Sequence, residues 1–169
     1  MPIPSGYTSG QVVQAVPVPS NQFAIFNEQQ ATNTNGGDFT SGSYVKRILN
    51  TTIINTISGC TLTSSVISLP AGTYNATAYA PAYSINGHRI RLQNTTASTT
   101  IVLGVNCFAN HSSPATTHSF LNATFTLSAT SNIELQHRCE TTRTVNGLGT
   151  LCNFGDNEVY AQIQIEKVA

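Results

Sequence analysis

Residues 68–83 read SLPAGTYNATAYAPAY and combine a tight turn with a strict two-residue alternation. Pro70 and Gly72 supply the fixed and the unusual backbone angles that a turn requires. Beyond the turn, one set of alternate positions is aromatic or small and the other is mainly polar. The first set is Tyr74, Ala76, Ala78 and Ala80, and the second is Asn75, Thr77 and Tyr79. This alternation predicts a strand with one buried face, and its alanines favour close packing against a second sheet.

The composition favours an all-β protein. The chain has 169 residues, enough for one domain with a hydrophobic core. Only 8% of the residues are charged, against about a quarter in ordinary globular proteins. Threonine, which prefers strands, is abundant, and so are asparagine, glycine and serine, which prefer turns.

The balance of charge excludes several classes of partner. Seven Lys and Arg residues offset seven Asp and Glu residues, so no net field attracts nucleic acid or an anionic membrane. No apolar run in the sequence approaches the roughly 20 residues of a membrane span, and its start lacks the basic and apolar regions of a signal peptide. We therefore expect neither nucleic acid nor a membrane as a partner, and the zero net charge favours self-association.

Residues 1–20 differ from the rest of the chain. Prolines at positions 2, 4, 17 and 19 keep this segment extended and out of a sheet interior, and it carries no charged side chain. We expect an N-terminal arm over 1–20 and a head domain over 21–169. The arm is either a disordered tail or an extended peptide along a partner, and its apolar content favours the partner. The residues predicted to contact that partner are Ile3, Pro4, Tyr7, Val12, Val13 and Val16.

After the arm, period-two segments alternate with clusters of turn residues. The expected strands are 22–27, 44–50, 52–57, 62–69, 73–83, 88–93, 99–107, 118–128, 132–140 and 158–167. Asn86-Gly87, between two of these strands, predicts a tight hairpin. Short strands at this spacing predict an all-β fold, a two-sheet antiparallel sandwich of jelly-roll type.

The last expected strand has one apolar face and one face of low charge. The low-charge face consists of Tyr160, Gln162, Gln164 and Glu166. Because a solvated strand face usually carries more charges, this face is predicted to contact another subunit.

The order of several segments resembles a known family. RILNT at 47–51 is followed by LPAGTY at 69–74, HRIRL at 88–92, FLNATFTL at 120–127, IELQHR at 133–138 and EVYAQIQI at 158–165. This order resembles the jelly-roll heads of the tumour-necrosis-factor and complement globular-head superfamily, above all the small heads of bacteriophage and large-virus structural proteins. The resemblance implies a homotrimer with the first and last strands near its threefold axis. The interface residues that it implies are Phe23, Tyr160, Gln162 and Gln164.

The sequence contains no familiar catalytic motif. Its histidines are His88, His111, His118 and His137, and none has the H-E-x-x-H spacing of a zinc-binding helix. A G-x-S-x-G nucleophile motif is also absent. We therefore expect no enzyme, no metal and no cofactor. One alternative is Ca²⁺ at Asp38, Asp156 and Glu158, although this ion prefers a larger cluster of oxygen ligands.

The cysteines form no C-x-x-C pair of the kind found in zinc ribbons and thioredoxin-like sites. They are Cys60, Cys107, Cys139 and Cys152. We expect them to be reduced and buried as small apolar side chains. The alternative is a disulfide between Cys139 and Cys152 across a loop.

These features predict a virion structural protein. The expected role is that of a trimeric capsid decoration protein on the capsid exterior, held by its arm to the major capsid protein or to another virion component. The alternative is a knob of a phage tail or head fibre that binds a receptor or a host-surface glycan through polar loops. The loop residues predicted for that role are Asn110, His111, Arg143 and Asn146. A secreted signalling ligand is disfavoured because the sequence shows neither a collagen stalk nor a transmembrane stem.

Overall fold

The computed structural model describes residues 22–168, which form antiparallel strands and no helix. The arm residues predicted to contact a partner, Ile3, Pro4, Tyr7, Val12, Val13 and Val16, lie outside the described residues. Within the described part there is no helix that could span a membrane. The division into arm and head stays a prediction.

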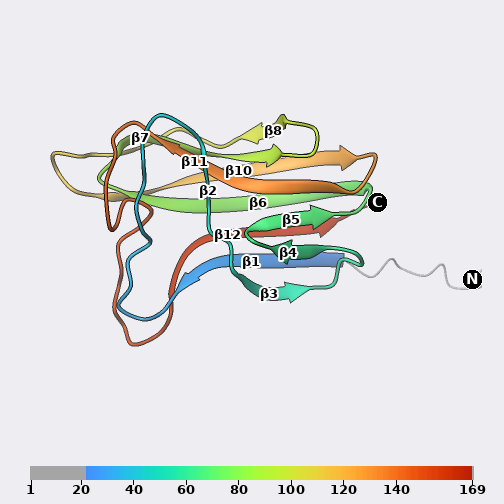
Figure 1. Ribbon diagram of the computed structural model, residues 1–169, viewed down its shortest axis with the longest axis horizontal. Helices are drawn as coiled ribbons and strands as arrows, with labels where there is room; N and C mark the ends of the chain where they lie inside the picture. The colour runs from blue at the N-terminus through green and yellow to red at the C-terminus, as the bar shows by residue number, and fades with distance from the viewer. Residues whose placement is uncertain (1–21, 169) are drawn as a thin grey trace, which may run out of the picture.

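The strands form two sheets whose strands run along the long axis of the molecule (Figure 1). The five-stranded sheet has the order β10 (Thr116–Leu127), β6 (Gly72–Tyr83), β12 (Glu158–Lys167), β1 (Gln22–Gln30) and β3 (Thr51–Asn55). The seven-stranded sheet has the order β4 (Thr61–Thr63), β5 (Val66–Leu69), β11 (Ser131–Cys139), β7 (Asn86–Asn94) and β8 (Thr99–Leu103). In addition, β2 (Val45–Lys46) pairs with β11, and β9 (Cys107–Ala109) pairs with β7. The predicted two-sheet antiparallel sandwich is confirmed.

The core lies between the two sheets, and β6 contributes the alanine-lined face that the sequence predicts. The buried residues of this face are Tyr74, Ala76, Ala78 and Ala80. They belong to one hydrophobic cluster with Ile90 and Leu135 of the seven-stranded sheet. At the corner before β6, the hydroxyl of Tyr74 donates a hydrogen bond to the carbonyl oxygen of Pro70 at 2.8 Å. The LPAGTY segment is therefore a structural corner whose buried aromatic ring closes its own turn.

Two expected strands are interrupted. Segment 62–69 turns back on itself at Ser64 and Ser65, whose φ angles of 48° and 62° create a hairpin between β4 and β5. Segment 99–107 is divided into β8 and β9 around Gly104. A Cβ atom on Gly104 would lie only 2.8 Å from the carbonyl oxygen of Phe120, so the backbone passes very close to β10 here. Neither break follows from the two-residue pattern.

The tight hairpin predicted at Asn86-Gly87 is wrong, because β6 and β7 belong to different sheets and do not pair with each other. Asn86 and Gly87, expected to form the turn, are the first residues of β7, and they pair with β9. The two-residue link is instead Ser84 and Ile85, and Ile85 is completely buried. Burial of this isoleucine is a physical reason for the earlier turn.

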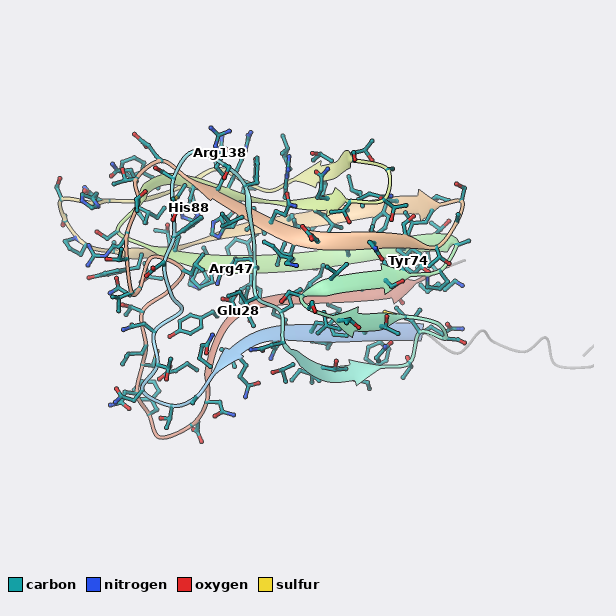
Figure 2. All side chains as sticks on the ribbon, viewed as in Figure 1. Glu28, Arg47, Tyr74, His88 and Arg138 are labelled. Carbon is teal, nitrogen blue, oxygen red and sulfur yellow. The ribbon has the colours of Figure 1, made fainter. Side chains whose placement is uncertain are left out.

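The segment from Val45 to Asn50 crosses from one sheet to the other. Its first residues pair with β11, and Arg47 donates its backbone N–H to the carbonyl oxygen of Leu135 at 2.9 Å. Three residues later, Asn50 donates to the carbonyl oxygen of Asn27 in β1 at 2.9 Å. The crossing carries the side chain of Arg47 into the space between the sheets (Figure 2).

Two long loops, 31–44 and 140–157, lie together at the end of the molecule opposite the end of β12 (Figure 1). They are joined by a β-bridge between Phe39 and Arg143 and by a hydrogen bond from Gly36 to Gly149. Phe39 and Leu148 belong to a second, smaller core beneath these loops.

The start of β12 corrects the prediction for Tyr160. Between the pairs Gln162–Asn27 and Val159–Gln29, β12 contains one more residue than β1, so a β-bulge turns its side chains over. Tyr160 is consequently 4% exposed and Val159 is 48% exposed. The hydroxyl of Tyr160 donates to the carbonyl oxygen of Thr34 at 2.7 Å within the same chain. The expectation that Tyr160 lies on the outer face with Gln162 and Gln164 is wrong.

The cysteines are free thiols in this structure. Cys60 and Cys139 are buried, and burial raises the pKa of each thiol to about 11. Cys107 is half-buried and Cys152 is exposed, so the expectation that the cysteines are buried is confirmed only for Cys60 and Cys139. The alternative of a disulfide between Cys139 and Cys152 is not what the structure contains.

Candidate functional site

The first candidate site is the face of the five-stranded sheet that points away from the other sheet, called the assembly face below. Register and exposure place on it Phe23, Ile25, Asn75, Thr77, Tyr79, His118, Phe120, Asn122, Thr124, Gln162, Gln164 and Glu166. Three of the predicted interface residues, Phe23, Gln162 and Gln164, are therefore brought together there. Among the described strand residues of this face, Glu166 is the single carboxylate.

An aromatic cluster lies at one end of the assembly face. The ring centroids of Tyr79, His118 and Phe120 are 6.2 Å apart in each of the three pairs. Phe120 is 50% exposed although it lies in the middle of a regular strand. An exposed aromatic cluster on a sheet with almost no charge is typical of a protein contact surface. The two-residue alternation of 118–128 was the signal that could have assigned Phe120 to this face.

A polar ladder occupies the middle of the assembly face. The tripeptide Asn-Ala-Thr occurs at 75–77 and again at 122–124, and the two copies pair antiparallel. Thr77 donates its hydroxyl to Asn122 Oδ1 at 3.0 Å, and Thr124 donates to Asn75 Oδ1 at 2.7 Å. The threonine hydroxyls and asparagine oxygens thus satisfy one another, which leaves a polar surface without charge.

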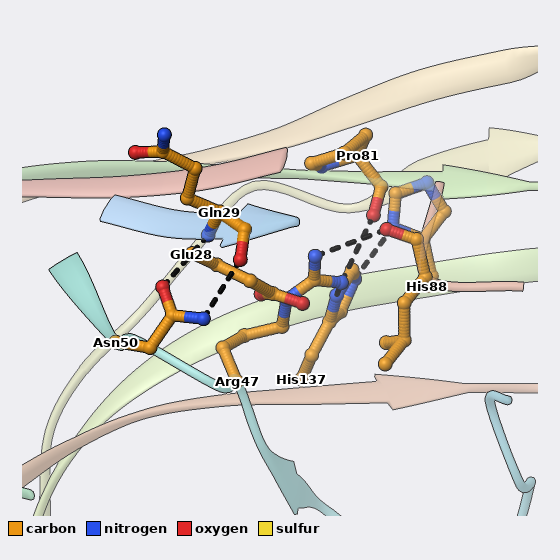
Figure 3. A network of polar contacts seen from close by, with 8 residues as sticks. Glu28, Gln29, Arg47, Asn50, Pro81, His88 and His137 are labelled. Atoms are coloured by element: carbon orange, nitrogen blue, oxygen red, sulfur yellow. Dashed lines mark hydrogen bonds and ion pairs between the residues drawn. The ribbon is translucent and has the colours of Figure 1, made fainter. Parts of the chain in front are cut away.

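The second candidate is a buried polar cluster between the sheets (Figure 3). Arg47 and Glu28 form an ion pair with Nε to Oε2 at 2.5 Å, and both side chains are inaccessible to solvent. Arg47 also donates through Nη2 to the carbonyl oxygen of Leu148 at 3.0 Å and through Nη1 to that of Pro81 at 3.3 Å. One guanidinium therefore joins β1, β6 and the 140–157 loop.

Two histidines continue this cluster. Arg47 has only donors, so Nδ1 of His137, 3.4 Å from Nη1, must accept. His137 consequently carries its proton on Nε2 and donates to Nδ1 of His88 at 2.9 Å. His88 in turn donates from Nε2 to the hydroxyl oxygen of Thr117 at 2.8 Å. Each hydrogen bond fixes the tautomer of the next ring, and the chain runs from the core to β10.

Burial keeps both imidazoles neutral. Desolvation, followed by the nearby charges of His118 and Arg47, lowers the pKa of His88 to about 4. Desolvation, and then the charge of Arg47, lowers the pKa of His137 well below its usual value. Because Glu28, Arg47 and His137 have no exposed surface, a substrate cannot reach them. The cluster ties the sheets together and offers no position for a reacting molecule.

The loop residues predicted to bind a receptor lie close together around Ser84. His111 Nδ1 lies 2.7 Å from the carbonyl oxygen of Ser84, and Arg143 Nη1 donates to the hydroxyl of Ser84 at 3.2 Å. Arg143 also donates to Asn146 Oδ1 at 2.8 Å, while Asn110 Oδ1 accepts from Ser112 within its own turn at 2.8 Å. The structure therefore brings two distant loops together, and internal hydrogen bonds occupy many of their polar groups.

Two of the three carboxylates considered for Ca²⁺, Asp38 and Glu158, stabilise loops. Asp38 Oδ1 accepts the backbone N–H of Val145 at 2.6 Å. Glu158 accepts from the backbone of Cys152 at 3.0 Å and of Asn153 at 2.8 Å, and these bonds lower the pKa of its carboxyl. Over residues 22–168, no group of three or more His, Cys, Asp or Glu side chains has the geometry to hold a metal ion.

Comparison with known proteins relates the chain to others by structure alone. No protein-family model and no curated protein sequence matches it. A crystal structure of murine APRIL superposes with a TM-score of 0.55 and 8% identity, over 88% of this chain and all of that one. Eiger TNF from S. frugiperda gives 0.58 and 14% identity over 88% of this chain and 93% of its own. The globular domain of a zebrafish complement 1qA protein gives 0.51 and 11% identity over 88% and 97%.

These structures belong to the tumour-necrosis-factor and complement globular-head groups, and each aligns with nearly the whole described region. Identities of 8–14% establish similarity of fold and no more. The superpositions agree with the sheet orders described above. The chain therefore has the jelly-roll fold of tumour-necrosis-factor-like heads.

Proposed function

We propose that the protein is a non-enzymatic structural head that assembles as a homotrimer through the assembly face. The observation that carries the proposal is the exposed aromatic cluster of Tyr79, His118 and Phe120 on a sheet face with a single carboxylate. Heads of this fold are often trimeric. Burying this face costs little desolvation of charge, and its aromatic surface contributes the apolar area that a stable interface needs.

The proposed site of action is the exterior of a virion, where the trimer decorates the capsid. Residues 1–20 would hold the head to the major capsid protein or to another virion component through apolar side chains such as Ile3, Tyr7 and Val12. This segment joins the head at Gln22, the first residue of β1, which lies in the sheet that carries the assembly face. A trimer suits threefold positions of an icosahedral shell, and low surface charge suits permanent contacts.

Deletion of residues 1–20 tests the anchoring role. The truncated head should keep its oligomeric state, because the assembly face is intact, but should no longer co-sediment with capsids stripped of the protein. Unchanged capsid binding by the truncated head would overturn the role of the arm. Failure of the full chain to bind capsids would overturn decoration itself.

A second candidate function is a receptor-binding knob, and exposed apolar residues at the loop end favour it. Phe154 is 86% exposed and Val145 is 62% exposed, both in the 140–157 loop. Large apolar side chains at a loop tip are typical of contact sites on other molecules. Binding of the intact protein to host cells, lost on Phe154→Ser, would favour the knob. Equal binding by the two proteins would exclude this loop.

A further inference from the structure

A pocket of about 560 Å³ opens at the surface of the seven-stranded sheet, near the ends of β7 and β11. Its walls include Arg89, Arg138, Glu140, Asn106 and Ser41. The size falls within the range of roughly 300–1,000 Å³ that small-molecule sites have. Figure 2 shows Arg138 at the outer margin of this sheet, with His88 beneath it on the side of the core. The pocket lies on a different sheet from the assembly face.

The two arginines of the pocket lie directly opposite each other. In the register of β7 and β11, Arg89 pairs with Arg138. Like charges in this position destabilise a sheet unless an ion of opposite charge lies between them. Within residues 22–168, the ion pairs of the structure involve Lys46 and Arg47, so neither pocket arginine has a carboxylate partner. The pair therefore presents guanidinium donors that an added anion would satisfy.

One of these guanidinium groups is held in place before any ligand binds. Arg89 donates from Nε to the hydroxyl of Tyr44 at 3.0 Å. The ring of Tyr44 is itself covered by the guanidinium of Arg91, 3.9 Å from the ring centroid. Arg138, in contrast, is exposed and can adjust to a ligand. A fixed donor beside a movable one reduces the entropy lost when an anion is bound.

The remaining lining is mixed: Glu140 adds one carboxylate, and Cys107 and Cys139 add apolar surface beside the polar side chains. Glu140 Oε2 accepts the backbone N–H of Gly87 at 3.0 Å, so this carboxylate is directed toward the backbone of β7. Both nitrogens of His88 are engaged, one with His137 and one with Thr117. Asn106 and Ser41 add an amide and a hydroxyl group to the lining. This combination matches a ligand with one compact anionic group and several hydroxyls.

We infer that this pocket binds an acidic sugar. The carboxylate of the sugar lies between Arg89 and Arg138, and its hydroxyls face Asn106 and Ser41. Charge-assisted hydrogen bonds from two guanidinium groups supply most of the affinity. The amide and hydroxyl groups distinguish a sugar acid from a bare inorganic anion. The site is independent of the proposed assembly, because its residues lie on the seven-stranded sheet.

Titration calorimetry of the full chain with D-glucuronate tests the inference, with D-glucose and inorganic phosphate as parallel ligands. Glucuronate should bind, and both glucose and phosphate should bind at least about tenfold more weakly, since each lacks one half of the recognised chemistry. Arg138→Gln should weaken glucuronate about tenfold or more. Lys167→Gln, which removes the same charge from the five-stranded sheet, is the matched control and should change nothing.

Each other outcome counts against the inference. Phosphate binding as tightly as glucuronate would leave an anion site with no preference for a sugar. Glucuronate binding that survives Arg138→Gln would place the sugar elsewhere, and the absence of binding by glucuronate at millimolar concentration would exclude the site. Shifts of the Gly87 and Asn106 amide resonances on titration give an independent location. Because Arg138 is exposed, its replacement leaves the fold intact, which a thermal melt verifies.

Discussion

Arg47 Nε donates to Glu28 Oε2 at 2.5 Å, and neither side chain retains any exposed surface. The pair joins the crossing segment to β1, while the other guanidinium nitrogens reach β6 and the 140–157 loop. The second carboxylate oxygen, Oε1 of Glu28, has no hydrogen-bond partner within the described residues. The cluster thus depends on Arg47 for nearly all of its charge compensation.

Replacement of Arg47 by Met should destabilise the fold by about 3–5 kcal/mol, because it leaves the buried carboxylate of Glu28 without its partner. Chemical denaturation followed by circular dichroism measures this change. The double replacement of Arg47 by Met and Glu28 by Leu should recover most of the loss, since no buried charge then remains. Equal stability of the Arg47→Met variant and the native chain would contradict the role assigned to the pair.

Acid should destabilise the fold through the buried histidines. The folded-state pKa of His88 is about 4, and burial also holds that of His137 well below its usual value, whereas both are near 6.5 in the unfolded chain. Above pH 6.5 their contribution is fully present. As the pH falls from 6.5 toward 4, these histidines bind protons in the unfolded state but stay neutral in the folded state. Each of them then lowers the free energy of unfolding by about 1.4 kcal/mol per pH unit.

Urea denaturation at a series of pH values checks this expectation. The free energy of unfolding should fall between pH 6.5 and 4.5, and the upper part of this window lies above the range in which ordinary carboxylates titrate. His88→Gln should reduce the slope in that window, because it removes one of the three histidines, with His118 and His137, whose pKa is lowered in the folded state. A flat profile for the native protein would show that the histidines are not held neutral as the hydrogen-bond chain requires.

Gly149→Ala should destabilise the loop end. Gly149 has φ of +141°, and a Cβ atom there would lie 2.3 Å from Cδ1 of Tyr160. Either the buried tyrosine moves and its hydrogen bond to Thr34 is lost, or the loop shifts. We expect a loss of about 2–4 kcal/mol, as for other overpacked positions with a strained backbone. Gly37→Ala is the control, because a Cβ atom there meets nothing within 4 Å at a similar φ of +103°. A smaller loss in Gly149→Ala than in Gly37→Ala would contradict the packing described for Tyr160.

Phe120→Asp should dissociate the proposed trimer. Phe120 is 50% exposed in the single chain, so the replacement costs little core packing, but a buried carboxylate in an apolar interface costs several kcal/mol. Sedimentation velocity should show a folded monomer. Phe108→Asp is the matched control, since Phe108 is 59% exposed on β9 of the other sheet. If Phe108→Asp lost the trimer and Phe120→Asp kept it, the interface would lie on the seven-stranded sheet, which would contradict the proposed assembly face.

The sequence predicts the architecture better than the sites. The buried face of β6 follows from local alternation, which is a property of neighbouring residues. The burial of Tyr160 does not, because it depends on a bulge defined by the register against β1. Arg47 lies in a segment that reads as an exposed alternating strand, YVKRILN, and its burial arises because that segment crosses between the sheets.

The sites depend on contacts that are distant in the sequence. His137 lies 90 residues after Arg47 and 49 after His88, and no local pattern links the three. Arg89 and Arg138 become neighbours only through the pairing of β7 with β11. Gln162 and Gln164 could be assigned to one face because the alternation of the last strand holds beyond its bulge, whereas Phe23 of β1 was expected there from the family resemblance.

Multi-angle light scattering of the full chain at micromolar concentration tests the proposed assembly most directly. We expect one species with three times the 18.0 kDa mass of the chain. The mass should not change on dilution to the low micromolar range, as expected for a permanent apolar interface. A species of 18.0 kDa would contradict the proposal that this head functions as a trimer through the face of Tyr79 and Phe120.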